Sequence, residues 1–352
     1  MGSIPMTDFR RPTIKDVATR AGVSRSTVSR HLNGLSVRGQ DDIQGAIAEL
    51  GYQPSRVARS LQSGATHAIG VIVPDITNPF FAAVVKGGES LAREQGYQLL
   101  LCNTDEDVAL ERAALDELMV RSVDGLLLCS AARDVSEVPA LASLPVPVAL
   151  LDRIIEGLDR DSVLVDNSGG SRQAAQHLAQ LGHKNIGVII GPMHTTPGRL
   201  RFEAFADALR EFGIPLQDQY VRQGEFREAG GYQAALRLVG AQPRPTAIYV
   251  VNNLMAIGAL KALHELGVAM PSEMSFISFD DLELAPLISP TPTVIARPMS
   301  EQGVLAMQLL LDRLSGNDVQ PSRRIVLDTA LVVRGSTAPP RVERSERGGR
   351  RS

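Results

Sequence analysis

The chain has 352 residues, of which 44% are hydrophobic and 21% charged, and its formal net charge is −3. These values are ordinary for a globular protein of two or three folded units, and no apolar run approaches the roughly 18 residues that span a bilayer. Because the start of the chain has no apolar segment typical of a secretory signal, we expect a cytoplasmic protein without a membrane partner. Its two cysteines, Cys102 and Cys129, each end an apolar run, which predicts buried, reduced thiols.

Charge is distributed unevenly along the chain. Residues 1–61 hold nine Arg and Lys against five Asp and Glu, and residues 337–352 hold five Arg against two Glu. The long central part is therefore acidic. A basic head on an acidic body indicates a polyanionic partner for the head alone.

Residues 12–53 are predicted to form three short helices. Thr13 and Asp16 have the spacing of a capping box, and apolar residues then recur at helical spacing. Gly22 is expected to end this helix, and Ser24 is a good N-cap for the next one. Two helices joined by a three-residue turn predict a helix-turn-helix.

Residues 54–66 contain SRVARSL, an amphipathic segment too short to be a stable helix alone, followed by a linker. From Ala68 onward, apolar strand-like runs alternate with helical stretches. These runs are AIGVIV, YQLLLC, GLLLC, VPVALL, SVLV, NIGVII, AIYVV and SFISF. Apolar strands between helices indicate parallel sheets that are covered on both faces. Because about 270 residues are too many for one such sheet, we predict an α/β fold of two doubly wound parallel-sheet lobes.

Polar side chains follow many of these strands, at the carboxyl ends where open parallel sheets bind ligands. They are Asp75, Asn78, Asn103, Asp152, Asn252, Asn253, Asp280 and Asp281. Carboxylates and amides suit the paired hydroxyls of a sugar, and an aromatic ring packs against its apolar face. Phe80, Phe81 and Phe226 can supply such rings in a chain without Trp. For any single polar residue, capping of the following helix is the alternative role.

Several motifs resemble the LacI/GalR repressor family and occur in that family's order. They include PTIKDVATRAGVSRSTVSRHLN, YQPSRVARSL, IGVIVPDITNPFF, QHLAQLGHKNIGVIIGP, AIYVVNNLMAIGAL and ISFDD. The resemblance implies a helix-turn-helix headpiece over 12–53, a hinge helix and linker over 54–66, a sensor over 67–336 and a disordered tail over 337–352. Within the sensor, the implied first lobe takes about 67–165 and 296–324, and the second about 166–295 and 325–336.

A DNA-reading surface follows from the same resemblance. The contacts that we expect are Ser24, Arg25, Ser26, Thr27, Ser29, Arg30, Arg56 and Leu61. Arg25, Ser26 and Arg30 fall at the family's base-reading positions, in a recognition helix that enters the major groove. Leu61 matches the leucine that the family inserts into the minor groove. The expected partner is double-stranded operator DNA, bound as an inverted repeat by a homodimer.

An effector cavity between the lobes is also implied. Its expected lining is Asp75, Asn78, Phe80, Phe81, Asn103, Asp152, Arg201, Phe226, Asn252, Asp280 and Arg297. Arg201 matches the family's effector arginine, Asp280 its partner acid, and Arg297 a position where other members place a polar effector contact. The expected effector is a mono- or disaccharide that releases the repressor from DNA. A purine or nucleoside corepressor is the alternative, although Thr195 and Pro197 replace the Arg and Thr of purine-sensing members.

The chain departs from the family pattern in two places. The segment between Asn33 and Leu50 is shorter than in purine-sensing members. Gly39 and Gly45 predict a third helix that is short or begins late. The tail lacks the leucine heptads of tetrameric members, which favours a dimer. No GxGxxG motif, phosphate loop, Ser-His-Asp elbow or metal-spaced His/Cys set is present, so we expect no enzyme activity, cofactor or metal.

Overall fold

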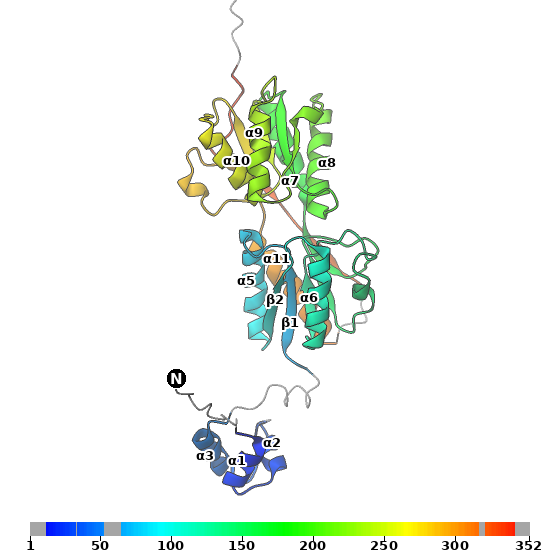
Figure 1. Ribbon diagram of the computed structural model, residues 1–352, viewed down its shortest axis with the longest axis vertical. Coiled ribbons are helices and arrows are strands. Elements are labelled where there is room, and N and C mark those ends of the chain that lie inside the picture. Colours follow the sequence, from blue (N-terminus) through cyan, green and yellow to red (C-terminus); the bar gives the residue numbers. More distant parts are fainter. Residues whose placement is uncertain (1–11, 33, 53–64, 317–320, 342–352) are drawn as a thin grey trace, which may run out of the picture. The chain divides into compact units, whose positions relative to one another are not determined.

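The computed structural model describes residues 12–32, 34–52, 65–316 and 321–341. The chain divides into two compact units, residues 1–67 and 68–352 (Figure 1). Most of the predicted hinge segment, including Arg56 and Leu61, lies outside the described residues.

The first unit contains a three-helix headpiece. Its helices are α1 (Ile14–Arg20), α2 (Arg25–Leu32) and α3 (Gln40–Leu50). Their apolar faces meet in a small core of Val17, Ala18, Val28, Ile43 and Ala46. The predicted capping box is confirmed: the Thr13 hydroxyl accepts the Asp16 N–H at 3.4 Å, and the Asp16 carboxylate accepts the Thr13 N–H at 2.8 Å. The headpiece therefore has the predicted helix-turn-helix fold.

The third helix differs from its prediction. With eleven residues, α3 is the longest described helix of the headpiece, so the first alternative, a short helix, is wrong; the helix begins at Gln40, directly after Gly39. Gly39 precedes it with a φ of 80°, and its carbonyl accepts the Ile43 N–H at 3.1 Å. Gly51 ends it with a φ of 60°. Both positions use the left-handed backbone that glycine adopts without a steric penalty, while Gly45 is accommodated inside the helix.

The second unit has two lobes, each built on a six-stranded sheet. In the first lobe the strand order is β11-β5-β4-β3-β1-β2, and all neighbouring strands are parallel. The strands are β1 (Ala68–Val73), β2 (Gln98–Asn103), β3 (Gly125–Leu128), β4 (Val148–Leu151), β5 (Asp161–Val165) and β11 (Arg324–Leu327). Helices α5 (Pro79–Glu94) and α11 (Met299–Leu314) cover one face, and α6 (Val108–Val120) covers the other.

The second lobe repeats this plan with the order β12-β10-β9-β8-β6-β7. Its strands are β6 (Ile186–Ile190), β7 (Val221–Gln223), β8 (Ala247–Val250), β9 (Ser275–Phe279), β10 (Thr293–Ala296) and β12 (Ala330–Val332). Its helices are α7 (Asn167–Gln180), α8 (Thr196–Glu211), α9 (Glu228–Val239) and α10 (Asn253–Glu265), with α7 packed on α8 and α9 on α10 (Figure 1). The edge strand β12 runs antiparallel to β10. The predicted α/β class with two doubly wound parallel-sheet lobes is confirmed.

The chain passes between the lobes three times, after β5, after β10 and after β11. The third passage lies later than expected, because Arg324–Leu327 pairs with β5 and so belongs to the first lobe rather than the second. The tail also differs from its prediction as far as Arg341. The Thr337 hydroxyl and His177 Nε2 share a hydrogen bond of 2.9 Å. The Ala338 carbonyl accepts a hydrogen bond from the Ser275 hydroxyl at 3.0 Å. These contacts hold the segment against the second lobe.

Both cysteines are free, as expected, but only Cys129 is buried. Cys102 is half-buried, because β2 lies at the edge of its sheet. Burial raises the pKa of both thiols, most strongly that of Cys129.

Candidate functional site

A cavity of about 190 Å³ lies between the two lobes, at the carboxyl ends of their parallel strands. Ten of the eleven residues predicted for the effector site line it. They are Asp75, Asn78, Phe80, Phe81, Asp152, Arg201, Phe226, Asn252, Asp280 and Arg297. Five of them, Asp75, Asn78, Asp152, Asn252 and Asp280, came from the pattern of polar residues after strands, and Arg201 and Arg297 came from the family resemblance.

Asn103 is the predicted residue that does not line the cavity. Its side-chain oxygen accepts the Ile76 N–H, and its amide donates to the Asp105 carboxylate, both at 2.7 Å. Asn103 ends β2, which is the edge strand, and its side chain is exposed. It fixes the two loops that follow β1 and β2.

Seven further lining residues were not predicted: Thr77, Asp105, Glu106, Arg153, Pro197, Glu225 and Arg227. Most of them lie in the loops that follow β2, β4 and β7. Arg153 is buried beside Asp152 and donates to both oxygens of Glu106 at 2.6 Å. Its position directly after a predicted site residue was the one available signal in the sequence.

Backbone strain is concentrated at this cavity. Eight described residues other than glycine have a positive φ, and six of them line the cavity: Asp105, Glu106, Asp152, Glu225, Phe226 and Asp280. Aspartate tolerates this conformation, whereas for Glu and Phe it is uncommon and costs about 1–3 kcal/mol. Strain of this kind persists where the surrounding structure fixes a residue for binding or catalysis.

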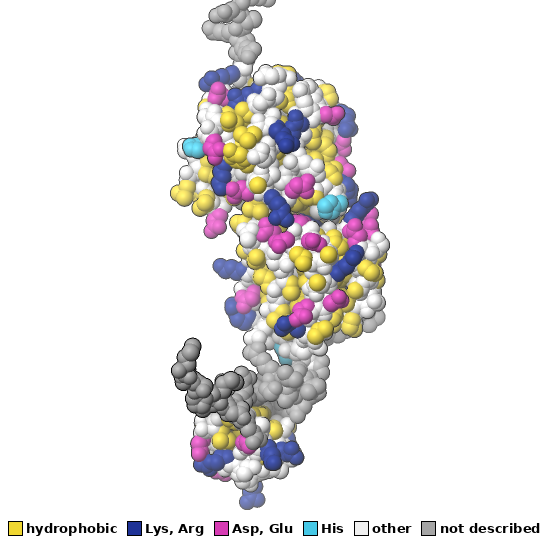
Figure 2. Space-filling model, in the orientation of Figure 1, with side chains coloured by type: hydrophobic (Ala, Val, Ile, Leu, Met, Phe, Trp, Pro, Cys, Tyr) yellow, Lys and Arg dark blue, Asp and Glu magenta, His cyan; other side chains and the backbone are white. Residues whose placement is uncertain are grey.

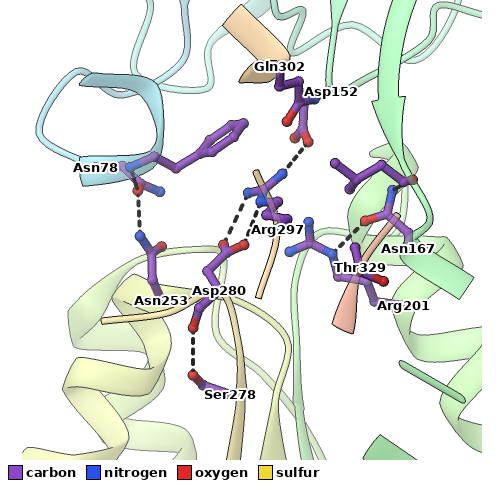
Figure 3. Close-up of polar contacts among 12 residues, drawn as sticks. Asn78, Asp152, Asn167, Arg201, Asn253, Ser278, Asp280, Arg297, Gln302 and Thr329 are labelled. Carbon is purple, nitrogen blue, oxygen red and sulfur yellow. Dashed lines mark hydrogen bonds and ion pairs between the residues drawn. The ribbon is translucent and has the colours of Figure 1, made fainter. Parts of the chain in front are cut away.

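Arg297 lies at the centre of the cavity and bridges two buried carboxylates (Figure 3). Its Nη1 lies 2.5 Å from Asp152 Oδ1, and its Nε lies 2.5 Å from Asp280 Oδ1. The guanidinium carbon stands 3.6 Å from the centre of the Phe80 ring. Burial alone would raise the pKa of Asp152. The guanidinium of Arg297, followed by those of Arg201 and Arg153, lowers this pKa by more than burial raises it, so the net shift is downward.

Arg201 is buried on the second-lobe side of the cavity. Its Nε donates to Asn167 Oδ1 and its Nη1 to the Val251 carbonyl, both at 2.7 Å. The guanidinium also stacks on the Phe279 ring at 3.6 Å. Among the described residues, its Nη2 has no hydrogen-bond partner. Burial first, and then the charge of Arg297, lower the pKa of Arg201 to about 10.

The predicted pairing of Arg201 with Asp280 is indirect. The carboxylate of Asp280 pairs with Arg297, while Arg201 is bonded to Asn167 and to the main chain. The negative charge of Asp280 still stabilises the charged form of Arg201, because it raises the pKa of Arg201 while burial lowers it.

Two asparagines cap helices and also lie in the cavity lining. Asn78 caps α5 by accepting the Phe80 N–H at 3.0 Å, and Asn252 caps α10 by accepting the Met255 N–H at 2.9 Å. Both also line the cavity. Asn78 accepts a further hydrogen bond of 2.8 Å from Asn253, which joins the two lobes (Figure 3).

In the headpiece, the six described candidates for DNA contact lie on or directly before α2: Ser24, Arg25, Ser26, Thr27, Ser29 and Arg30. The Ser24 hydroxyl accepts the Thr27 N–H at 3.1 Å, so it caps this helix as predicted. Arg25, Ser26 and Arg30 are exposed. Figure 2 shows basic side chains protruding from the headpiece surface. Arg56 and Leu61 lie outside the described residues.

Comparison with known proteins identifies the family. Residues 13–55 match the family model described as "Bacterial regulatory proteins, lacI family", and residues 175–337 match that of a periplasmic binding protein-like domain. The ribose operon repressor of Escherichia coli K12 is 37% identical over 330 residues, which are 92% of this chain and 99% of that protein. The chain belongs to the lacI family of bacterial regulatory proteins. The homologous repressors are not enzymes, in agreement with the expectation of no catalytic activity.

Solved structures of lacI-family proteins share the fold. The lac repressor dimer bound to operator and an anti-inducer is 28% identical, with a TM-score of 0.82, and the match covers 94% of this chain and all of that one. A lacI-family regulator from Enterococcus faecium with bound ribose is 31% identical, with a TM-score of 0.70 over 77% of this chain and 99% of that one. Within the described residues, no helix is long and apolar enough to cross a membrane, and no cluster of three or more metal-binding side chains occurs.

Proposed function

We propose that this regulator is a repressor that binds palindromic operator DNA as a homodimer and is released when a neutral sugar occupies the cavity between its lobes. Arg201 carries the effector part of the proposal. Its Nη2 is a buried donor without a partner among the described residues, on a side chain that lines the cavity. A buried donor left unpaired costs about 1–3 kcal/mol, so a ligand oxygen at this position recovers that energy on binding.

The charge balance of the cavity favours an uncharged ligand. Its buried cations are Arg153, Arg201 and Arg297, and its buried or largely buried acids are Glu106, Asp152 and Asp280. These buried groups neutralise one another. The other charged lining residues, which are partly or fully exposed, are Asp75, Asp105, Glu225 and Arg227. An added phosphate or carboxylate would disturb this balance, whereas hydroxyl groups can donate to the acids and accept from the guanidinium groups.

The size and lining of the cavity favour a monosaccharide. Its volume of about 190 Å³ is smaller than the roughly 300–1,000 Å³ of sites for drug-sized ligands. The Phe80 ring, which we expected to stack on the sugar, is already covered on one face by Arg297. Phe81 and Phe226, which also line the cavity, remain as rings for the apolar face of the ligand. The ribose bound to the Enterococcus faecium relative is a ligand of this size class.

A purine corepressor is less well supported. The hydroxyl of Thr195 caps α8 by accepting the Gly198 N–H and donates to the Pro192 carbonyl at 2.8 Å. It is therefore occupied within the protein. Pro197 lines the cavity and carries no N–H donor. Neither residue offers a free polar group to the edge of a base.

For DNA, we assign base reading to Arg25, Ser26 and Arg30, and phosphate contacts to Ser24, Thr27 and Ser29. Arginine near the start of a recognition helix can bind guanine O6 and N7 with two hydrogen bonds. Arg56 and Leu61 are assigned to the hinge on the motif alone. Insertion of Leu61 at the centre of the operator would couple two hinges at the dyad.

The homodimer is supported by apolar side chains that the single chain leaves exposed. Leu284 and Leu287, in the segment after β9, are 63% and 82% exposed beside a groove lined by Ile257 and Leu260 of α10. Apolar patches of this kind in water-soluble proteins mark association surfaces. A cytoplasmic location is part of the proposal, because the bacterial chromosome on which a DNA-binding regulator acts lies there.

A two-stage measurement tests the proposal. Pentoses, hexoses, disaccharides and purines are first screened against the full chain by thermal shift, because a ligand of the folded state raises Tm. Operator DNA selected from a random pool is then titrated with and without each hit by fluorescence anisotropy. We expect a monosaccharide to raise Tm and weaken operator binding. A response to purines alone would overturn the sugar assignment, and the absence of any selected sequence would overturn the DNA assignment.

A further inference from the structure

Arg297 occupies an unusual place in the chain. It directly follows β10 of the second lobe and precedes α11 of the first, so it lies on one of the three passages between the lobes. Asp152 follows β4 of the first lobe, and Asp280 follows β9 of the second. The side chain at the passage thus holds one carboxylate from each lobe (Figure 3).

The contacts of Arg297 resemble those expected of a bound sugar. Its planar guanidinium stacks on the Phe80 ring at 3.6 Å, and it bonds Asp152 and Asp280 along its edges. All three charged side chains are at most 4% exposed. Buried carboxylates and a buried guanidinium in such contact are strongly coupled, because loss of one partner leaves an uncompensated charge.

Further hydrogen bonds, outside this ionic group, cross the seam between the lobes. Asn253 donates to Asn78 at 2.8 Å, and Arg227 donates to the Asp105 carbonyl at 3.0 Å. The main-chain N–H of Ile154, in the first lobe, donates to the Thr196 hydroxyl of the second lobe at 3.0 Å. These bonds form only while the lobes are held together, so they report on the seam.

We propose that Arg297, Asp152 and Asp280 form a built-in clamp that holds the two lobes together before any effector binds. The effector then acts by rearranging a seam that already exists, since its hydroxyl groups compete with Arg297 for the same two carboxylates. Only this last step rests on the proposed sugar-sensing function. The clamp itself is a property of the protein without DNA or ligand.

Hydrogen exchange of the Ile154 amide tests the clamp directly. The full chain, without effector or operator, is compared with Arg297→Gln by hydrogen–deuterium exchange and mass spectrometry. Exchange of a hydrogen-bonded amide follows the free energy of the local opening that exposes it. We expect the peptide containing Ile154 to exchange about tenfold faster or more in Arg297→Gln, while the strand amides of β1 and β8 stay protected.

The matched control is Arg313→Gln. Arg313 also forms a largely buried ion pair, with Asp161 at 2.9 Å, but both residues belong to the first lobe. This variant should leave exchange at Ile154 unchanged. Faster exchange of the β1 or β8 amides in Arg297→Gln would mean that this variant is partly unfolded. In that case Asp152→Asn is used as the test variant, because it breaks only the first-lobe arm of the clamp.

Two results would overturn the clamp. One is exchange at Ile154 in the folded clamp variants that is as slow as in the parent. The other is an Ile154 amide in the parent that already exchanges like an exposed loop amide. Because neither operator nor sugar is present, these outcomes are independent of a failure of the proposed function.

Discussion

The headpiece and the sensor present the side chains that we propose to be functional in opposite ways. In the headpiece, Arg25 and Arg30 project from one helix into solvent, and Arg20 pairs with Glu49 while both remain more than half exposed. In the sensor, Arg201 and Arg297 are buried, and loops from both lobes surround them. A surface that reads a polyanion needs free cations, whereas a cavity for a small neutral ligand needs charges that are already balanced.

This difference determines how each region should respond to change. We expect that replacing a side chain exposed on α2 has little effect on folding and changes only the affinity for DNA. A buried cavity residue supports the fold of both lobes as well as the ligand, so its replacement affects stability and binding together.

The largest effect is expected when a buried charge loses its partner. Asp280→Asn leaves the size of the side chain unchanged, and asparagine tolerates the positive φ of this position. The change removes one of the two negative charges that neutralise Arg297. We expect the sensor to lose about 3–5 kcal/mol of unfolding free energy, measured by urea denaturation. Glu49→Gln is the matched control, because it breaks the exposed ion pair with Arg20 and should cost at most about 1 kcal/mol. Equal costs for the two variants would contradict the comparison.

Exposed residues of α2 should show the opposite pattern. Arg25→Ala should weaken operator binding by about 1–3 kcal/mol and relax the preference for one base pair in each half-site. Its unfolding free energy should stay within about 0.5 kcal/mol of the parent, as is usual for exposed sites. Anisotropy with single-base operator variants measures the first effect. Arg210→Ala, an exposed change in the sensor, is the control, and equal loss in both variants would show that Arg25 contributes only general charge.

A glycine in the cavity wall allows a smaller change, expected to alter sugar affinity but not operator affinity. A Cβ at Gly191 would lie 2.1 Å from the Phe226 ring, so Gly191→Ala must push that ring from the cavity wall. We expect about tenfold weaker sugar binding, or about 1.4 kcal/mol, with operator affinity unchanged. Gly240→Ala is the control, because its Cβ meets nothing closer than 3.5 Å. Parental sugar affinity in Gly191→Ala, measured by titration calorimetry, would remove Phe226 from the site.

The smallest effect is expected in the headpiece. A Cβ at Gly45 meets no atom within 4 Å, and the residue lies within α3. Gly45→Ala should therefore stabilise the headpiece by about 0.5–1 kcal/mol through helix propensity and the unfolded chain. Calorimetry of the full chain measures the headpiece transition. A lower transition temperature would mean that α3 needs glycine for a reason that the structure does not contain.

Much of the fold was predictable because its signals are local. The capping box at Thr13, the glycine that follows α1, and the apolar runs of the central strands depend on neighbouring residues alone. Four strands were missed: β7, β10, β11 and β12. Their pairing is set by distant segments, as β11 with β5 illustrates. Order in the tail likewise depends on His177 and Ser275, far away in sequence.

The site was predictable in composition but not in its pairings. Polar residues after strands led to Asp152 and Asp280, because topology alone brings strand ends together. Nothing in the sequence indicated that Arg297 would bond both, or that Arg201 would turn to Asn167 instead. Glu225 and Arg227 were missed although they flank the predicted Phe226, because they follow β7, a three-residue strand that the sequence pattern did not show.

The central claim is that occupancy of the sensor cavity controls operator binding, and Arg201→Ala tests it most directly. Operator affinity is measured by anisotropy with and without the sugar found in the thermal screen, for the parent, Arg201→Ala and Arg199→Ala. Arg199 lies on the same helix, but its side chain is 39% exposed and pairs with Glu203 on the surface. We predict that the sugar weakens operator binding of the parent and of Arg199→Ala by about 1–3 kcal/mol, the usual range of allosteric coupling. Arg201→Ala should be less stable, as expected for a buried site, but at a temperature where it is folded it should bind the operator like the parent and fail to respond to the sugar. A full response of Arg201→Ala at parental sugar concentrations would contradict the account and place the effector elsewhere.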